Sequence, residues 1–278
     1  MLYRAFFALP KSITGKGGQS VNALLGTANL ILREVEDREP RAVVLCFGPD
    51  AARYRVKLYE PYHAQRPPVP DELAPQFDDA PAFFNAFGWS SVIDDELEAD
   101  DVMGSLARAE QDAGGEALLM TGDRDLFQCV TDRVKVLYIR TGGKGSELID
   151  ATEVMRRYGV PPELVPDFIA LRGDPSDGLP GAKGIGEKTA ADLLRRRGSL
   201  EAVLEGAVRE RPARVSGALI DGADEIRTFK DIATLRTVKV KRPPDRDTDF
   251  AAAAAAASER GMGRLAGRLE QMAEAGAG

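Results

Sequence analysis

Three apolar runs, separated by segments with helical spacing, constrain the fold of the first half of the chain most strongly. The runs are residues 42–47 (AVVLCF), 117–121 (ALLMT) and 134–139 (VKVLYI). We expect each to form a strand, the first two buried on both faces. Helices are predicted at about 20–37, 71–87, 97–113 and 152–158. Strands that alternate with helices predict an α/β fold with a mainly parallel sheet.

From about residue 150 onward the sequence predicts helices alone. Asp150 and Glu153 have the spacing of a capping box, and Gly159 followed by Pro161 ends that helix. Further helices are expected at 164–171, 187–197, 200–204 and 223–233, and a terminal helix at 251–273 interrupted near Gly261 and Gly263. We therefore expect an α/β core over 1–150, a helical region over 151–242 and a helical tail over 243–278.

Composition excludes several classes of protein. Of the 278 residues, 44% are hydrophobic and 29% are charged. No apolar run approaches the roughly 18–20 residues of a transmembrane helix. No secretory signal is visible, so a cytoplasmic protein is expected. Cys46 and Cys129 lie in apolar contexts and are expected to be reduced core residues. Because His63 is the single histidine, any metal should be bound by oxygen, which favours magnesium, manganese or calcium over zinc.

Carboxylates are grouped near the ends of predicted elements. The groups are Glu98, Asp100 and Asp101 at the start of an amphipathic segment, Asp123 and Asp125 directly after a predicted strand, and Asp174 and Asp177 in a turn rich in Gly and Pro. On a helix, Glu98 and Asp101 share a face and could meet one cation. Each group also has a structural alternative. The group at Glu98 could be an acidic first helical turn, the group at Asp123 a solvated turn, and the group at Asp174 an ordinary loop.

Three such groups without histidine suit two hard cations held close together, an arrangement that hydrolyses phosphodiesters. Their seven charges equal the net charge of −7, so the rest of the chain is about neutral and its acidity does not argue against nucleic acid. A fourth group, Asp94 to Glu96, is interpreted as solvated surface.

A glycine-rich turn covers residues 181–189 (GAKGIGEKT). It is not a nucleotide phosphate loop, because Glu187 separates the last glycine from Lys188. It fits a Gly-x-Gly turn between two helices, whose backbone N–H groups can bind a DNA phosphate. Lys183, Lys188 and the run 195–197 (RRR) add positive charge, and a simple helix connector is the alternative.

Basic and aromatic side chains alternate over residues 53–66 (RYRVKLYEPYHAQR). Such a segment can bind phosphates and stack on unpaired bases, whereas a solvated strand and loop is the alternative. His63 could contact a phosphate or act as a general acid, although a lone histidine often does neither.

Five segments together resemble the 5′-nuclease domain of bacterial DNA polymerase I and the wider flap endonuclease family. They are LYRAFFALP, YxxYxxxRPPxPDEL, LEADDVMGSLA, TGDRDLFQ and LRGDPSDGLPGAKGIGEKTA, in order from Leu2 to about Val240. The resemblance implies a nuclease core (PIN-like), a helical arch or gateway near 50–85, and a helix-hairpin-helix type element that binds duplex DNA, often with potassium. No polymerase segment follows, so the chain is similar to the stand-alone form.

The resemblance also implies roles for individual residues. Glu98, Asp100 and Asp101 match ligands of one metal ion, and Asp123, Asp125, Asp174 and Asp177 match those of a second, with Mg²⁺ or Mn²⁺ as the ions. Arg4, His63 and Arg66 match residues at the scissile phosphate, and Tyr62, Lys183, Gly184, Gly186, Lys188 and Thr189 match DNA contacts.

Three positions depart from the family pattern. The family has an apolar strand ending in Asp-Gly before the LYRAF segment, whereas this sequence begins at Met1, so we expect the true start to lie upstream. The family's Phe-Asp at the next strand end is Phe47-Gly48 here, and Asp50 is the candidate substitute ligand. The family's gateway lysine corresponds to His63.

The sequence thus predicts a metal-dependent 5′-3′ exonuclease and flap endonuclease acting on DNA with 5′ ends or flaps, in replication and repair. One alternative is a DNA-structure-binding protein of the same fold with impaired catalysis. Another is a carboxylate–metal phosphatase for small substrates, which the predicted DNA-binding turn disfavours.

Overall fold

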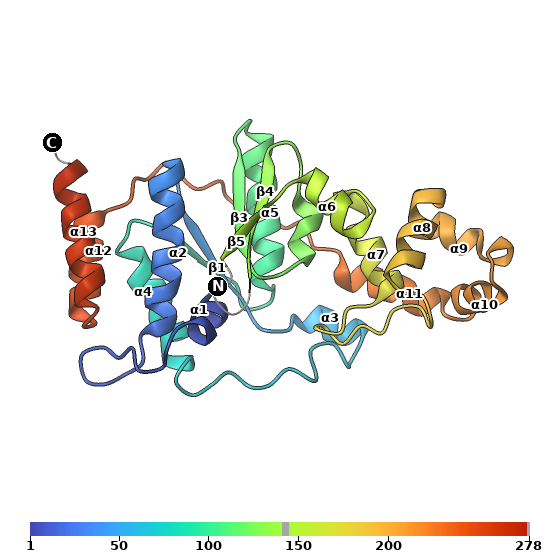
Figure 1. Cartoon of the computed structure of the whole chain (residues 1–278), viewed down its shortest axis with the longest axis horizontal. Coiled ribbons are helices and arrows are strands. Elements are labelled where there is room, and N and C mark those ends of the chain that lie inside the picture. Colours follow the sequence, from blue (N-terminus) through green and yellow to red (C-terminus); the bar gives the residue numbers. More distant parts are fainter. Residues whose placement is uncertain (141–144, 277–278) are drawn as a thin grey trace.

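Two small sheets form the centre of the computed structural model, which describes residues 1–140 and 145–276 (Figure 1). In one sheet, β1 (Val44–Phe47) pairs in parallel with β2 (Ser90–Ile93). In the other, β3 (Ala117–Thr121) is parallel to β4 (Val134–Ile139), which is antiparallel to β5 (Ser146–Ile149). The predicted α/β fold with mainly parallel strands is confirmed, and β2 and β5 were not predicted.

The expectation that the first two predicted strands are buried on both faces is wrong. Every residue of β1 is partly exposed, and in β3 only Leu119 and Thr121 are buried. Within the described residues β1 and β3 are both edge strands and do not pair with each other, which accounts for their exposure. A strand upstream of Leu2 stays a prediction.

Helix α5 (Ala99–Asp112) packs against both β1 and β3 and so joins the two sheets. It has the strong amphipathic pattern that predicted it, and it buries Val102, Ser105 and Ala107. Its first turn carries Asp100 and Asp101, which places acidic side chains near the carboxyl ends of both strands.

One hydrophobic core, here called the terminal core, lies at the end of the molecule that carries the C-terminal helices (Figure 1). Its helices are α1 (Leu2–Ala8), α2 (Asn22–Arg38), α4 (Ala74–Asn85), α12 (Phe250–Glu259) and α13 (Gly263–Gly276). Phe84, Phe87 and Trp89 pack their rings together at its centre. The interruption predicted in the terminal helix is confirmed, because Gly261 adopts a φ of 78° between α12 and α13. Glycine adopts such a positive φ without steric cost.

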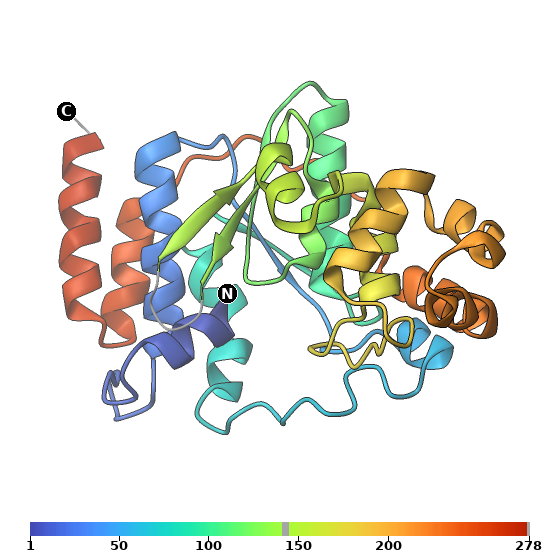
Figure 2. The ribbon, with the colours of Figure 1, turned by 45° about the vertical axis from the view of Figure 1, so that its right-hand side comes forward.

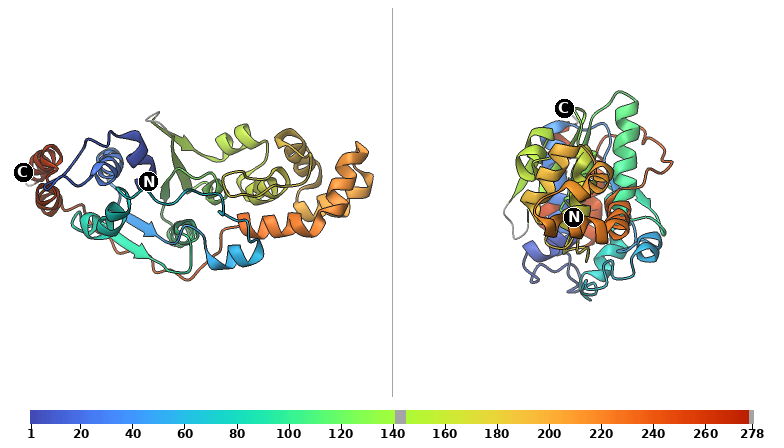
Figure 3. Two further views of the ribbon diagram at one scale, coloured as in Figure 1. Left: turned by 90° about the horizontal axis from the view of Figure 1, so that it is seen from below. Right: turned by 90° about the vertical axis from the view of Figure 1, so that its right-hand side faces the viewer.

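A second core fills the other end of the molecule, where helices follow the sheet without further strands (Figure 3). Its α-helices are α6 (Ala151–Tyr158), α7 (Val165–Arg172), α8 (Glu187–Arg197), α9 (Leu200–Glu205), α10 (Ala213–Asp221) and α11 (Ala223–Ala233), with short 3₁₀ turns η1 (Asp125–Cys129), η3 (Pro162–Leu164) and η4 (Ala207–Arg209). The Asp150 side chain caps α6 by accepting from the N–H of Glu153 at 2.8 Å. This is the N-cap that the sequence predicts. Helix α10 was not predicted.

The segment predicted as a helical arch is only partly helical. It consists of α3 (Arg53–Leu58), a connection over residues 59–73 without a helix, and α4. Figure 2 shows this connection passing from the helical region back to the terminal core. Its prolines, at positions 61, 67, 68 and 70, lack the N–H that a helix requires, which explains the irregular backbone.

The C-terminal connection over residues 234–249 runs from α11 past α5 to the terminal core and is held mainly by side chains. The hydroxyl of Ser105 accepts from the N–H of Val238 at 3.0 Å. Glu110 pairs with both Arg41 and Arg242, and the indole N–H of Trp89 donates to Thr248 at 2.9 Å. These contacts return the tail to the end of the molecule opposite the helical region.

No helix in the described part of the chain is both long and apolar enough to cross a membrane. Cys46 and Cys129 are free thiols, and burial raises the pKa of each to about 12. Such a pKa keeps both thiols protonated near neutral pH.

A buried ion pair connects the arch, the core and the helical region. Arg55 of α3 donates two hydrogen bonds to Asp101 of α5, at 2.9 and 2.8 Å, and one to the carbonyl of Ile232 in α11 at 3.0 Å. Asp101 also accepts from the Tyr54 hydroxyl and the N–H of Arg236. Asp101 is fully buried and Arg55 is 2% exposed. Both charges therefore depend on this pairing.

We expect Arg55→Ala to lower the free energy of unfolding by about 3–5 kcal/mol, because it leaves the buried Asp101 carboxylate without its partner. Urea denaturation monitored by circular dichroism measures this change. Arg53→Ala, at an exposed position of the same helix, is the matched control and should have little effect. Equal midpoints for the two variants would contradict the structural role of the pair.

Candidate active site

The turn after β3 brings the first pair of carboxylates to the carboxyl end of a strand. The Thr121 hydroxyl accepts from the N–H of Asp123, and the Asp123 carboxylate accepts from the N–H of Asp125, each at 2.9 Å. These local bonds define the turn before η1 begins at Asp125. The two aspartates after the predicted strand therefore lie in a hydrogen-bonded turn at the end of β3, where α/β proteins bind ligands.

The loop after α7 brings the second pair. Asp174 and Leu179 exchange two backbone hydrogen bonds of 2.8 Å, which close a tight loop. Gly173 has a φ of 85°, and a Cβ there would lie 2.7 Å from the carbonyl oxygen of Leu179. Glycine is therefore required on both counts. The loop directs Asp177 toward the core and leaves Asp174 beside Arg172.

A small cavity of about 40 Å³ collects five of the seven predicted carboxylates. They are Glu98, Asp100, Asp123, Asp125 and Asp177; Arg55, Tyr62, His63, Arg66 and Leu235 complete the lining. Asp174 lies outside this cavity and lines its larger neighbour. Side chains from α5, the β3 turn and the α7–α8 loop thus converge as predicted.

Burial raises the pKa values of three aspartates in this cavity, and the charges of neighbouring carboxylates raise them further. Burial, followed by the charges of Asp123 and Glu98, raises the pKa of Asp100 to about 7. Burial also raises the pKa of Asp123, and burial with the charge of Asp123 raises that of Asp125 well above its usual value. In contrast, Asp177 has a lowered pKa because hydrogen bonds and charge from His63 and Arg66 outweigh its burial.

Within residues 1–140 and 145–276, no three His, Cys, Asp or Glu side chains close around one point at coordination distance. The carboxylates line a shared cavity and several accept hydrogen bonds from protein donors. Glu98, for example, accepts from the N–H of Ala52 at 2.7 Å and from the Tyr62 hydroxyl at 3.0 Å. Ion binding would therefore require carboxylates such as Glu98 to exchange these protein donors for the ion.

Asp101 is not among the residues that line this cavity, so its predicted role as a metal ligand beside Glu98 gains no support here and stays a prediction. Both of its oxygens are occupied by Arg55, Tyr54 and the N–H of Arg236. The reason is that Arg55, which is distant in sequence, reaches the start of α5 and pairs with both Glu98 and Asp101, at 3.1 and 2.8 Å.

His63 and Arg66 reach the acidic cavity from the arch. His63 places Nε2 3.2 Å from Asp177 and Nδ1 2.5 Å from the carbonyl oxygen of Asp50. Arg66 donates to Asp177 at 2.9 Å and to Asp50 at 3.0 Å. Both predicted phosphate-contacting residues therefore lie at the site. Asp50, in contrast, is bound by Arg66 outside the cavity lining, which gives no support to its role as a substitute ligand.

Tyr62 and Gly48 are both closely packed in the structure. The Tyr62 side chain is 5% exposed, stacks on the His63 ring at 3.8 Å and donates to Glu98, so it cannot stack on a base in this conformation. A Cβ at Gly48 would lie 2.2 Å from the carbonyl oxygen of Leu97. This close approach of β1 to the start of α5 explains why a side chain is absent at that position.

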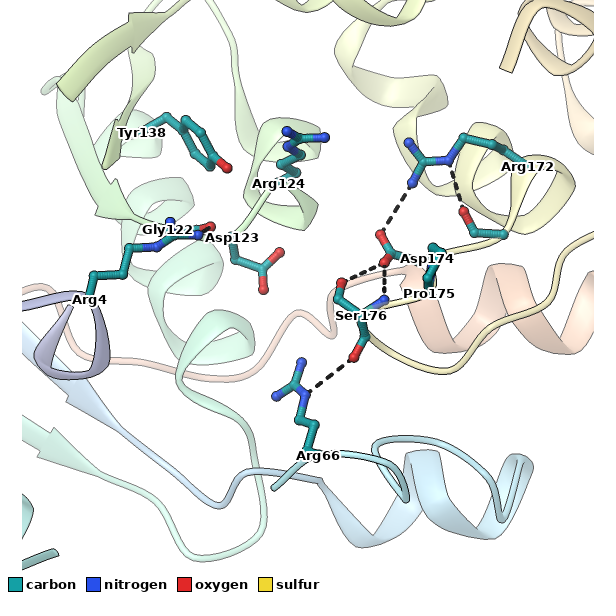
Figure 4. A pocket seen from close by; sticks show the side chains of 11 residues that line it. Arg4, Arg66, Gly122, Asp123, Arg124, Tyr138, Arg172, Asp174, Pro175 and Ser176 are labelled. Carbon is teal, nitrogen blue, oxygen red and sulfur yellow. Dashed lines mark hydrogen bonds and ion pairs between the residues drawn. The ribbon is translucent and has the colours of Figure 1, made fainter. Parts of the chain in front are cut away.

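Arg4 on α1 lies beside the β3 turn, where Nη2 donates to the carbonyl of Gly122. Its Nη1 is buried and has no hydrogen-bond partner in the described residues. Arg4 lines a larger cavity next to the acidic one, as Figure 4 shows.

The glycine-rich turn connects α7 to α8 and is open to solvent. Gly184 has a φ of 73°, and a Cβ at either Gly184 or Gly186 would have no other atom within 4 Å. Lys183 and Lys188 are exposed, Thr189 is half-buried, and α8 begins at Glu187 as predicted. The backbone N–H groups before α8 are therefore accessible to an anion.

Sequence reasoning missed Tyr138 and the roles of Arg55, Arg124 and Arg172. Arg124 and Arg172 stand inside the quoted TGDRD and LRGD segments, directly beside predicted ligands, so their position next to the carboxylates was a usable signal. Tyr138 lies mid-strand on β4 and had no such signal.

Because the pKa of Asp100 is raised, we expect the folded chain to become less stable as the pH rises when a chelator keeps metal ions away. Asp100, whose pKa is raised to about 7, binds its proton more tightly in the folded state. The stability present below its unfolded pKa of about 4 is therefore lost as pH rises through the folded value. We expect the melting temperature in EDTA to decrease across this window, and less so in Asp100→Asn. A melting temperature in EDTA that does not change with pH in the wild-type chain would contradict the raised pKa of Asp100.

Two family models match the chain. That of the 5′-3′ exonuclease N-terminal resolvase-like domain matches residues 1–159, and that of the 5′-3′ exonuclease C-terminal SAM fold matches residues 160–251. A 5′-3′ exonuclease of Mycobacterium tuberculosis is 36% identical over 275 residues, covering 88% of this chain and 85% of that protein. DNA polymerase I of Mycobacterium bovis is 35% identical over 248 residues, covering 88% of this chain but 27% of the polymerase, so the chain spans about a quarter of its length.

The fold is also that of a solved nuclease. The bacteriophage T5 D15 flap endonuclease, crystallised as a pseudo-enzyme-product complex with DNA and metal ions, superposes with a TM-score of 0.65 at 16% identity and covers 90% of each chain. The sequence matches over both regions, together with this fold, show that the chain belongs to the 5′-3′ exonuclease family.

Proposed function

We propose that the chain is a metal-dependent 5′-3′ exonuclease and flap endonuclease that hydrolyses DNA phosphodiesters. The observation that carries this proposal is the convergence of five carboxylates on one cavity beside Arg66 and His63. An acidic cavity bordered by cationic side chains can bind metal ions together with a phosphate group. Membership in the 5′-3′ exonuclease family supports the same reaction.

The donor set fits two Mg²⁺ or Mn²⁺ ions. All of its members supply oxygen. Burial and mutual repulsion raise the pKa values of Asp100 and Asp125, and bound cations would offset both effects. The proposed ligands are Glu98, Asp100, Asp123, Asp125, Asp174 and Asp177. When bound, such ions lower the pKa of the attacking water and stabilise the leaving oxygen.

The protein's cations bind and orient the scissile phosphate in this proposal. Arg66 is held by Asp50 and Asp177, so its guanidinium is oriented before substrate arrives. Arg4 and His63 approach the same site from α1 and the arch. The water oxygen bonds to phosphorus as the bond from phosphorus to O3′ breaks. The water gives up a proton to solvent and O3′ takes one from solvent, which leaves a 5′-phosphate and a 3′-hydroxyl.

The open turn before α8 is proposed to bind the duplex away from the cut. The N–H groups of Gly184 and Gly186 would contact a phosphate, with Lys183, Lys188 and Thr189 around it and potassium as a further ligand of the turn. The proposal has three further parts. They are the division into a nuclease core, a helical DNA-binding region and a C-terminal tail, a cytoplasmic location, and a role in replication and repair.

The alternative is a DNA-structure-binding protein with impaired catalysis. The lack of a carboxylate at Gly48 and the withdrawal of Asp101 favour it, because both reduce the number of available ligands. Retained DNA binding without any metal-dependent cleavage by the wild-type chain would support this alternative.

Asp123→Asn should abolish metal-dependent cleavage of a 5′-labelled flap duplex while DNA binding persists. The substitution removes a charge from the centre of the site but leaves the backbone of the turn intact. Cleavage is followed on gels with magnesium or manganese, and binding by fluorescence anisotropy. Asp132→Asn, an exposed aspartate nearby in sequence, should cleave normally. Full activity of Asp123→Asn would refute the proposed site.

Lys183→Ala and Lys188→Ala should each weaken duplex binding and reduce the slope of log Kobs against log salt by about 1, if each lysine neutralises one phosphate. Titrations at several salt concentrations measure the slope. Lys135→Ala is the control. This exposed lysine lies near the amino end of β4, whereas Asp123 follows the carboxyl end of the neighbouring parallel strand β3. Unchanged slopes in both variants would exclude the turn from the DNA interface.

A further inference from the structure

A second, larger cavity adjoins the acidic one and has the opposite charge. Its volume is about 570 Å³, and it shares Asp123 and Arg66 with the acidic cavity, so the two are contiguous. Figure 4 shows Arg4 and Asp123 on one side, Arg172 and Asp174 on the other, and Arg66 below them. Four arginines and two aspartates line it, which gives the wall a formal net charge of +2.

Two of the four guanidinium groups that line the cavity are available for an external anion, whereas those of Arg66 and Arg172 pair with aspartates. Within the described residues, neither Arg4 nor Arg124 forms an ion pair with a carboxylate. Both lie near the ring of Tyr138, at 5.5 and 5.8 Å from its centroid, and Arg4 has a buried Nη1 without a partner. The ring faces help to hold these cations in place. A buried, unpaired guanidinium N–H is a donor that a ligand would satisfy.

Arg172 is oriented toward the same space from the opposite wall. Its guanidinium packs over Phe168 at 5.2 Å and Tyr158 at 5.9 Å from the ring centroids. Nε donates to the carbonyl of Gly173 at 2.8 Å and Nη2 to Asp174 at 3.2 Å. These contacts hold the side chain in place, so little conformational entropy would be lost when it binds an anion.

A phosphate monoester is the anion that this wall favours. It carries a charge of about −1.5 to −2 near neutral pH, compared with about −1 for a phosphodiester, so several arginines discriminate in its favour. The cavity volume of about 570 Å³ accommodates one nucleotide. This size is within the range of small-molecule sites. When a scissile phosphodiester lies over the carboxylates, the phosphate of the adjoining nucleotide can reach this second cavity.

We propose that the arginine-lined cavity binds the terminal 5′-phosphate of the strand being degraded, with Arg124 and Arg172 as specificity-determining residues. The inference rests on the nuclease function proposed above. It makes the enzyme selective for 5′-phosphorylated over 5′-hydroxyl ends when it removes the terminal nucleotide.

Two recessed-end duplexes that differ only in a 5′-phosphate or a 5′-hydroxyl test this proposal. We expect kcat/KM for release of the first nucleotide to be about tenfold or more higher for the phosphorylated end in the wild-type chain. Arg124→Gln and Arg172→Gln should each bring this ratio toward one. Because the ratio compares two substrates in the same variant, a general loss of activity or stability cancels. Arg108→Gln, at an exposed position of α5, should keep the wild-type ratio.

Binding of the same duplexes in EDTA separates the subsite from catalysis. The subsite is supported if the wild-type chain binds the phosphorylated end more tightly and Arg124→Gln and Arg172→Gln do not. This holds even if neither duplex is cleaved, and in that case only the proposed nuclease function fails. The subsite is overturned if the wild-type chain binds both duplexes equally and cleaves them at equal rates with metal. That result leaves the proposed nuclease function intact.

Discussion

The buried pair of Arg55 and Asp101 is the interaction on which the arrangement of the site depends. Two charges removed from water stabilise a fold only when each is fully hydrogen-bonded, and here both are. The pair connects α3, α5 and the carbonyl end of α11, so it sets how the arch and the helical region approach the carboxylates. Asp101 therefore organises the site without facing it.

Charge is separated around the proposed active site. Carboxylates from α5, the β3 turn and the α7–α8 loop lie together in a small cavity, where burial and then mutual repulsion raise the pKa values of Asp100 and Asp125. Arginines surround the adjoining cavity, where only two aspartates balance them. An acidic compartment suited to cations thus borders a basic compartment suited to phosphate, and Asp123 and Arg66 belong to both.

The two hydrophobic cores lie on opposite sides of this site and are linked by α5 and by the connection over residues 234–249. That connection packs through Ser105 and Glu110, side chains of the same helix that begins with the acidic residues. The C-terminal helices therefore stabilise the end of the molecule that supplies Arg4, whereas the α8 turn belongs to the other end. Substrate bound at both the site and the turn would contact both ends.

The sequence by itself determined the features that depend on neighbours in the chain. The β3 and β4 bounds, the cap at Asp150, the helices at 187–197 and 223–233, and the carboxylate turns all follow from local spacing and propensity. Only the tertiary structure decided that Asp101 pairs with Arg55, that Tyr62 is buried against His63, and that Arg124 and Arg172 border a common cavity. These outcomes depend on residues brought together from distant parts of the chain, and no local pattern records which charged or aromatic side chain meets which partner.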